Sequence, residues 1–160
     1  SPPPSSFLSP PMTGSLYSVE INGKKMPEAG VNALIAGHFG VPVVFVAGDS
    51  AICHQSEELL GDQVVTAAVK EGIGEAAQML HPQKARELIK KKTQEALSRL
   101  DDFNPYQLDS PYTMEVIFKD EEDAENAAWI PGAQRTGPTS VSFTSSDFIE
   151  VLKFFKFARS

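Results

Sequence analysis

The sequence predicts an α/β protein in which strands and helices alternate around a central, mainly buried sheet. Val41–Ala47 is a continuous apolar run of mostly β-branched residues, which is typical of a strand buried on both faces. His81–Leu100 instead carries its apolar residues at helical spacing. Residues 112–118 alternate between apolar and polar side chains, as a strand with one buried face does.

The first elements are a strand and a helix. Residues 16–21 are rich in strand-forming side chains and lead into the turn dipeptide Asn22-Gly23. Pro27 suits a first helical turn, and Gly40 ends the helix. The apolar residues between them recur at helical spacing: Val31, Leu34, Ile35 and Phe39.

The middle of the chain repeats this alternation. The strand at 41–47 stops at Gly48-Asp49-Ser50, a short helix follows over 51–60, and 64–69 is a second buried strand. His81-Pro82 then begins the clearest helix. Its apolar face contains Ala85, Leu88, Ile89, Leu97 and Leu100.

The last part adds strands at 112–118 and 139–143, with a short helix over 123–129 between them. The terminal helix begins after a cap at Ser145-Ser146-Asp147. Its core stripe is predicted to contain Phe148, Val151, Leu152 and Phe155.

Composition bounds the organisation and the partners. Residues 1–13 form a Pro/Ser-rich lead that we expect to be flexible, and 14–160 are expected to form a single α/β domain. The net charge of −7 argues against a nucleic-acid partner. No apolar run approaches the roughly 20 residues of a membrane span. The single cysteine, Cys53, forms no internal disulfide, so we expect a cytoplasmic protein.

Three polar positions are candidates for a binding site. Asp49 follows a buried strand, at the end where ligands bind in open α/β sheets, or it caps the next helix. Lys70 ends another strand and either reaches a substrate carboxylate or extends to water. Arg135, in the polar segment 135–139, either clamps an anion or belongs to a surface turn. Gly72-Ile73-Gly74 is too incomplete for a phosphate-binding loop.

The 3 histidines do not stand at zinc-ligand spacing. His38 is expected to cap the end of its helix, and His81 to be a cap or loop residue. Cys53 and His54 are adjacent on a predicted helix, so their side chains diverge by about 100°. They are therefore not expected to form a nucleophile–base pair.

Four ordered blocks of the sequence resemble the zinc-dependent D-aminopeptidase family. They are Glu28-Ala29-Gly30-Val31-Asn32-Ala33, Val41-Pro42-Val43 with Val46-Ala47-Gly48-Asp49, Thr66-Ala67-Ala68-Val69-Lys70, and Thr136-Gly137-Pro138-Thr139. The resemblance runs from about Met12 to the end of the chain. It implies that Glu28 is a metal ligand, that the metal is zinc, and that the substrates are small peptides with N-terminal D-residues. It also implies a homo-oligomer in the form of a self-assembled ring.

The chain departs from the family pattern in its other ligands. Family members carry an Asp-x-Glu pair and two histidine ligands before the region that is similar here. They also carry a catalytic histidine just upstream of the stretch resembling Met12-Thr13-Gly14, where this chain has Ser9-Pro10-Pro11. The chain is therefore similar to the C-terminal portion of such an enzyme.

Two hypotheses follow. The chain belongs functionally to a metal-dependent aminopeptidase that hydrolyses peptides with a zinc-activated water, as one part of a split or longer enzyme. Alternatively, it is a non-catalytic α/β assembly or binding module that retains the family fold.

Overall fold

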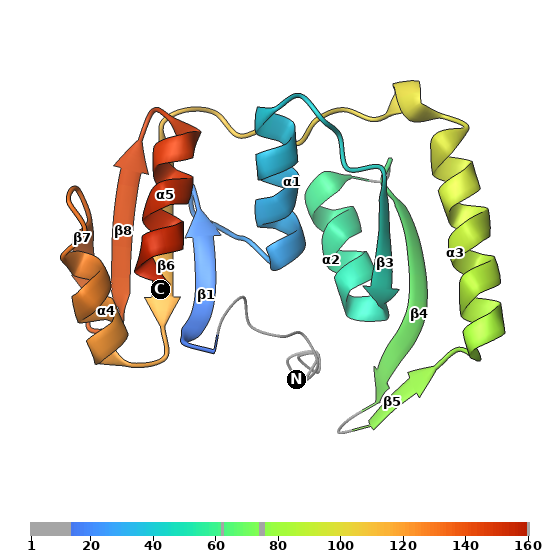
Figure 1. The fold of residues 1–160 in the computed structure, drawn as a ribbon, viewed down its shortest axis with the longest axis horizontal. Helices are drawn as coiled ribbons and strands as arrows, with labels where there is room; N and C mark the ends of the chain where they lie inside the picture. The colour runs from blue at the N-terminus through green and yellow to red at the C-terminus, as the bar shows by residue number, and fades with distance from the viewer. Residues whose placement is uncertain (1–13, 62, 74–75, 160) are drawn as a thin grey trace. The chain divides into compact units, whose positions relative to one another are not determined.

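The computed structural model describes residues 14–61, 63–73 and 76–159, so the predicted lead at 1–13 lies outside the described residues. The chain divides into two compact units. Of the described residues, unit 1 contains those between 32 and 106, and unit 2 contains 14–31 together with 107–159. Each unit has a sheet with helices packed on it (Figure 1), which confirms the predicted α/β class.

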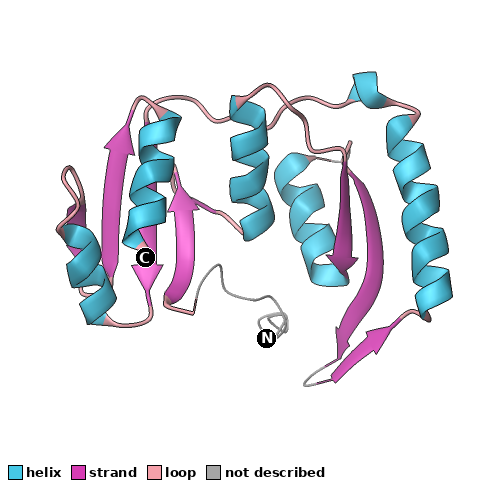
Figure 2. Ribbon diagram, viewed as in Figure 1, coloured by secondary structure: helices cyan, strands magenta, loops and turns pink. Residues whose placement is uncertain are grey.

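Unit 1 is built on a three-stranded sheet in the order β3-β4-β5. β3 (Phe45–Asp49) and β4 (Val65–Ile73) are parallel, and β5 (Ala76–Met79) is antiparallel to β4. α2 (Ser50–Leu60) joins the two parallel strands as a crossover. α2 and α3 (Pro82–Leu97) both pack on β3 and β4 (Figure 2).

Among the described residues, β3 contributes to two clusters in the core of unit 1. Val46 packs with a cluster of buried Ala33, Leu60 and Val64. Phe45 packs with a second cluster of buried Val65, Ala96 and Phe103. Because successive side chains of a strand point to opposite faces, the two clusters cover the two faces of β3.

The strand predicted over 41–47 is placed and buried differently from the expectation. Its regular part begins at Phe45, Val41 is 55% exposed, and residues 42–46 are only half-buried. The reason is that β3 is an edge strand of the described sheet, whereas a fully apolar run predicts an interior position.

Two other expectations, both about the long helix, need correction. The helix α3 ends at Leu97, which is 58% exposed, while Ala96 is buried against the sheet. Leu100 begins the short 3-10 helix η1 (Leu100–Asp102) instead of extending α3. Gly72 and Ile73 belong to β4 and pair with Ala77 and Ala76 of β5.

Unit 2 is built on a five-stranded antiparallel sheet in the order β2-β1-β6-β8-β7. The strands are β1 (Leu16–Ile21), β2 (Lys24–Lys25), β6 (Tyr112–Phe118), β7 (Gln134–Gly137) and β8 (Ser140–Ser145). β6 has the predicted bounds, whereas β7 replaces part of the predicted polar loop, because its polar residues pair with β8. No helix among the described residues is long and apolar enough to cross a membrane.

Two helices pack on this sheet, α4 (Glu121–Ala128) and α5 (Phe148–Ala158). The predicted stripe of α5 is confirmed at Phe148, Val151 and Phe155, which are buried. Phe154 is also buried, and its ring stacks on Phe143 of β8 with the centroids 5.1 Å apart. The predicted cap is confirmed as well, since Asp147 accepts a hydrogen bond from the Ile149 amide at 2.8 Å.

Candidate functional site

Glu28 is the first residue of α1 (Glu28–His38), and the preceding turn fixes where this helix starts. Asn22 adopts the left-handed φ of 51° that the turn requires. Its side chain accepts a hydrogen bond from the Thr113 amide at 2.8 Å and donates one to the Asp109 carbonyl at 3.1 Å. Met26 is buried, and its amide bonds to the Val19 carbonyl at 2.8 Å. The turn and the buried methionine thus tie the start of α1 to the sheet of unit 2.

The Glu28 carboxylate is exposed to solvent. It makes no hydrogen bond or ion pair with any residue that the structure describes. Its place in the first helical turn favours a negative charge, because the backbone amides there leave a partial positive charge. The side chain is therefore an anionic oxygen donor on a well-anchored backbone.

The described residues do not supply the rest of a metal centre. Among residues 14–61, 63–73 and 76–159, no three His, Cys, Asp or Glu side chains gather where a metal ion fits. A zinc site needs at least three protein ligands, and a structural site usually has four. Glu28 is thus one donor of a set that this part of the chain does not complete.

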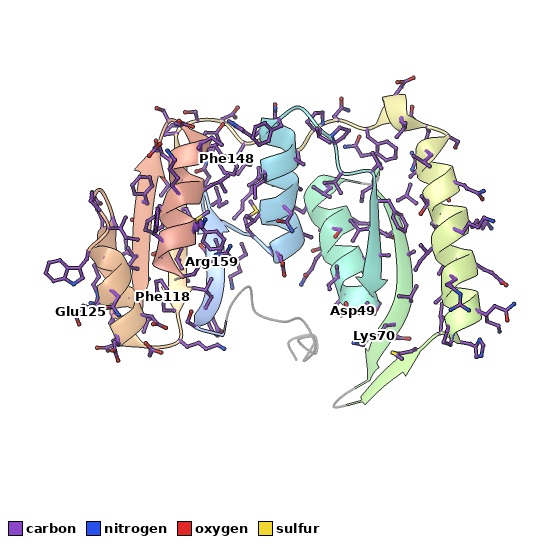
Figure 3. The ribbon with its side chains drawn as sticks, in the orientation of Figure 1. Asp49, Lys70, Phe118, Glu125, Phe148 and Arg159 are labelled. Atoms are coloured by element: carbon purple, nitrogen blue, oxygen red, sulfur yellow. The ribbon has the colours of Figure 1, made fainter. Side chains whose placement is uncertain are left out.

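Asp49 is the last residue of β3, and its partner on β4 is Lys70 (Figure 3). The two are paired in register, after a bulge between Gly48 and Asp49. Contrary to the prediction, Lys70 does not end its strand, because β4 continues to Ile73 by pairing with β5. Asp49 is buried, and its Oδ1 accepts the Ile52 amide at 2.8 Å, so the helix-cap interpretation is confirmed. Lys70 is half-buried and forms no ion pair with Asp49 or any other described residue.

The structure separates Cys53 from His54. Cys53 is buried on the inner side of α2, and burial raises the pKa of its thiol. His54 is exposed, and its Nδ1 lies 3.6 Å from Glu57 Oε2. A buried protonated thiol and an outward-facing imidazole do not form a nucleophile–base pair, as the sequence predicted.

The other histidines have local structural roles. His81 caps α3, since its Nδ1 accepts the Gln83 amide at 3.3 Å. This confirms the predicted cap. His38 is the last residue of α1, and its ring meets Phe39 edge-on at 5.1 Å between centroids.

Arg135 holds a turn. Its Nε donates to the Gly137 carbonyl at 3.1 Å, and its Nη2 donates to the Pro138 carbonyl. Two nitrogens of the guanidinium thus donate to the backbone that joins β7 to β8. This supports the surface-turn interpretation over an anion clamp.

A polar row across the unit 2 sheet was not singled out from the sequence. Glu20 of β1 stands opposite both Lys25 and Glu115, and Glu115 stands opposite Ser142. Glu115 Oε1 accepts the Thr136 hydroxyl at 2.6 Å. The alternation of β6 already places Glu115 on the face opposite Met114 and Val116, but only strand pairing shows which residues stand beside it.

Each comparison with known proteins finds a D-aminopeptidase. A family model described as D-aminopeptidase matches residues 4–157. The D-aminopeptidase of Bacillus subtilis (strain 168) is 38% identical over 132 residues, which are 81% of this chain and 48% of the relative. The solved structure titled Zn-dependent D-aminopeptidase DppA from Bacillus subtilis, a self-compartmentalizing protease, is similar with a TM-score of 0.83 and 34% identity. That match covers 92% of this chain and 56% of the other, so the chain spans about half the length of these relatives.

Proposed function

Because the chain belongs to the D-aminopeptidase family, we propose that it forms part of a zinc-dependent aminopeptidase that removes N-terminal residues from small peptides. The family model spans residues 4–157, which is nearly the whole chain and includes Glu28. This coverage is the observation that carries the proposal. The expected substrates are short peptides with N-terminal D-residues, because both relatives are D-aminopeptidases by name.

Glu28 is the residue of this chain that we assign to the metal. Its carboxylate is exposed and has no partner among the described residues, so binding a cation breaks no existing interaction. Carboxylate oxygen is an ordinary zinc ligand, and a bound zinc ion activates water for peptide hydrolysis. The helix start that presents Glu28 is held by the buried Met26 and by the Asn22 turn, which keeps the backbone of Glu28 in a defined position.

The remaining ligands must come from outside the described residues. The described residues contain no group of three or more metal-binding side chains, and this chain spans only about half the length of the relatives. The proposal is therefore that a second stretch of polypeptide completes the centre. Assembly into a closed homo-oligomer is part of the proposal, because the related structure is titled a self-compartmentalizing protease. The cytoplasm remains the proposed compartment on the argument of a single, unpaired cysteine.

The test combines this chain with the half of the Bacillus subtilis D-aminopeptidase that it does not match. The co-expressed pair is expected to retain zinc after dialysis and to release D-alanine from a D-Ala dipeptide. Glu28→Gln is expected to lower both the zinc content and the turnover, because a neutral amide oxygen is a poor ligand for zinc.

Glu121→Gln is the matched control. Glu121 is also exposed and is also the first residue of a helix in unit 2, so its substitution removes the same charge–dipole interaction. Zinc content and turnover are expected to stay at the parent level in this variant. Equal zinc content in the parent and in Glu28→Gln would remove Glu28 from the metal site.

A further inference from the structure

The turn between β1 and β2 consists of Asn22-Gly23, a pair that is chemically reactive as well as turn-forming. In an unprotected chain, the backbone nitrogen that follows an asparagine attacks the side-chain carbonyl carbon, Cγ, and displaces ammonia. A following glycine favours this attack, because no side chain hinders its nitrogen. Asn22 is the only asparagine of the chain that precedes a glycine; the others are Asn32, Asn104 and Asn126. From the sequence alone, deamidation is thus expected to be fastest at Asn22.

The structure leaves the nucleophile of this reaction unrestrained. Asn22 and Gly23 are both exposed, and their φ angles are the positive ones of the turn, 51° and 74°. The Gly23 amide donates no hydrogen bond to any residue that the structure describes. Solvent therefore reaches this nitrogen, and nothing in the described fold hinders the loss of its proton.

The carbon that would be attacked is, in contrast, held in place. Asn22 Oδ1 accepts a hydrogen bond from the Thr113 amide at 2.8 Å, and Nδ2 donates one to the Asp109 carbonyl at 3.1 Å. The backbone amide of Asn22 also donates to the Thr113 carbonyl at 2.8 Å. Both ends of the planar side-chain amide are thus bonded to the segment 109–113, and Cγ is fixed between them.

Deamidation cannot proceed from this arrangement. A bond between Gly23 N and Asn22 Cγ closes a succinimide ring, so the side chain must first rotate onto its own backbone. This rotation breaks the hydrogen bonds to both Thr113 and Asp109. The loss of two hydrogen bonds of ordinary net strength corresponds to a rate that is at least about tenfold lower.

We propose that Asn22 is a deamidation site that the native fold protects, and that its modification loosens the start of α1. In the reaction, the bond between Gly23 N and Asn22 Cγ forms and the bond between Cγ and Nδ2 breaks. Ammonia leaves with the proton of the Gly23 amide. Water then opens the succinimide at either carbonyl and produces aspartate or isoaspartate at position 22. The only co-reactant is water, and no group is oxidised or reduced.

The product cannot restore the lost contact. A carboxylate has no hydrogen to donate to the Asp109 carbonyl, so an anionic oxygen would face that carbonyl where Nδ2 now stands. Isoaspartate also adds a methylene to the main chain of a turn in which Ile21 pairs with Lys24. Because this turn fixes where α1 begins, we expect the backbone of Glu28 to become less constrained.

The first test compares deamidation of the folded chain with that of the chain unfolded in guanidinium chloride, at mildly alkaline pH. Peptide mapping by mass spectrometry measures the conversion of Asn22 with time, and an isoaspartyl methyltransferase detects the isoaspartate. The folded chain is expected to react at least about tenfold more slowly. Asn126 is exposed but is followed by alanine, so it serves as the internal control and should stay intact in both samples. A synthetic peptide of residues 18–26, with and without denaturant, corrects for the solvent.

The second test is Asn22→Asp, which reproduces one of the two products. The equilibrium constant for unfolding is expected to rise at least about tenfold in a denaturant titration at neutral pH, because the bond to Asp109 is replaced by a repulsion. Asn104→Asp is the matched control. Asn104 is exposed and makes no hydrogen bond with a described residue, so the same charge is added without the loss of a contact. An Asn22→Asp variant that does not fold, beside a folded control, is the same result in its extreme form.

Hydrogen exchange locates the effect in Asn22→Asp. The Gly30 and Val31 amides bond to the Pro27 carbonyl at 2.8 and 3.1 Å in the first turn of α1. Their exchange is expected to be at least about tenfold faster than in the parent, because the segment before them is less constrained. The Ile149 amide, at the start of α5, is the internal reference and should exchange at the parent rate.

Three results would overturn the inference. They are equal deamidation rates in the folded and unfolded chain, an Asn22→Asp variant as stable as the parent, and unchanged exchange at Gly30 and Val31. The inference goes beyond the proposed function and requires neither zinc nor peptidase activity. A failure of the catalytic proposal would therefore leave it standing.

Discussion

Gly37 of α1 lies directly against the backbone of Tyr106. A Cβ atom at Gly37 would stand 1.9 Å from the Tyr106 carbonyl oxygen and 2.8 Å from its carbonyl carbon. Both residues belong to unit 1, and Tyr106 packs against the cluster that contains Ala33, Leu60 and Val64. The loop after η1 approaches the helix this closely only because position 37 has no side chain.

Gly37→Ala is therefore expected to destabilise unit 1. Alanine gains about 1 kcal/mol over glycine in a helix interior, but the neighbouring atoms are backbone and cannot rotate away. We expect a net loss of about 1–3 kcal/mol, as for other over-packed sites. Urea unfolding measures it. Gly14→Ala, with no atom within 4 Å of the added carbon, is the control and is expected to change stability by less than about 0.5 kcal/mol. A Gly37→Ala variant as stable as the parent would contradict the close approach.

The Tyr106 hydroxyl gives a second prediction. Its oxygen is buried and has no hydrogen-bond partner among the described residues, and burial raises the pKa of the phenol. Tyr106→Phe removes an unsatisfied polar group, so we expect stability at neutral pH to be unchanged or to rise by up to about 1 kcal/mol. If the hydroxyl does have a hydrogen-bond partner, Tyr106→Phe removes that hydrogen bond. The variant would then be less stable than the parent, which would contradict the prediction.

The same phenol predicts a dependence on alkaline pH. The unfolded chain releases this proton near pH 10, while the folded chain retains it to higher pH. The free energy of unfolding should thus fall as pH rises above about 10. In Tyr106→Phe it should fall less steeply with pH than in the parent. The measurement is denaturant unfolding at about pH 8 and about pH 11. Parallel curves for the two proteins would show that Tyr106 does not titrate in a buried site.

Cys53 is expected to react slowly with thiol reagents. Its side chain is buried, and burial raises the thiol pKa, so little thiolate forms near neutral pH. Labelling with a disulfide reagent should be slow in the folded chain and complete within minutes in denaturant, with Cys53→Ala as the blank. Rapid labelling of the folded chain would show that α2 opens readily or that the thiol is not buried.

Asp49 should behave as a helix cap. Asp49→Ala removes the acceptor of the Ile52 amide, and the expected loss is about 0.5–2 kcal/mol. Asp49→Asn keeps a side-chain oxygen at the same place and is expected to retain most of the stability. Thermal unfolding of the two variants compares them. A loss in Asp49→Asn as large as that in Asp49→Ala would show that the negative charge, and not the cap, stabilises this position.

Local chemistry was sufficient to predict most of the helices and strands. The β6 strand has the predicted bounds because its alternation matches a sheet with one buried face. The cap at Asp147 was predicted, and a cap was one of two alternatives at Asp49, because a short polar side chain before a helix satisfies amides of the first turn. His81 was expected to be a cap or a loop residue, and the structure shows the cap. The family was also recognisable from short blocks of sequence around Glu28 and Asp49, and the comparisons confirm it.

Pairing between distant segments was decided only by the tertiary structure. Nothing near Arg135 in the sequence shows that residues 134–137 pair with β8, because polar edge strands have no apolar pattern of their own. The apolar run of β3 predicted an interior strand, yet among the described residues it stands at a sheet edge. The contact between Gly37 and Tyr106 joins residues that are far apart along the chain. By itself, then, the sequence determined the local elements, their caps and the family, because these depend on neighbouring residues. The strand neighbours and the surroundings of Glu28 depend on contacts between distant segments, and only the folded chain specifies them.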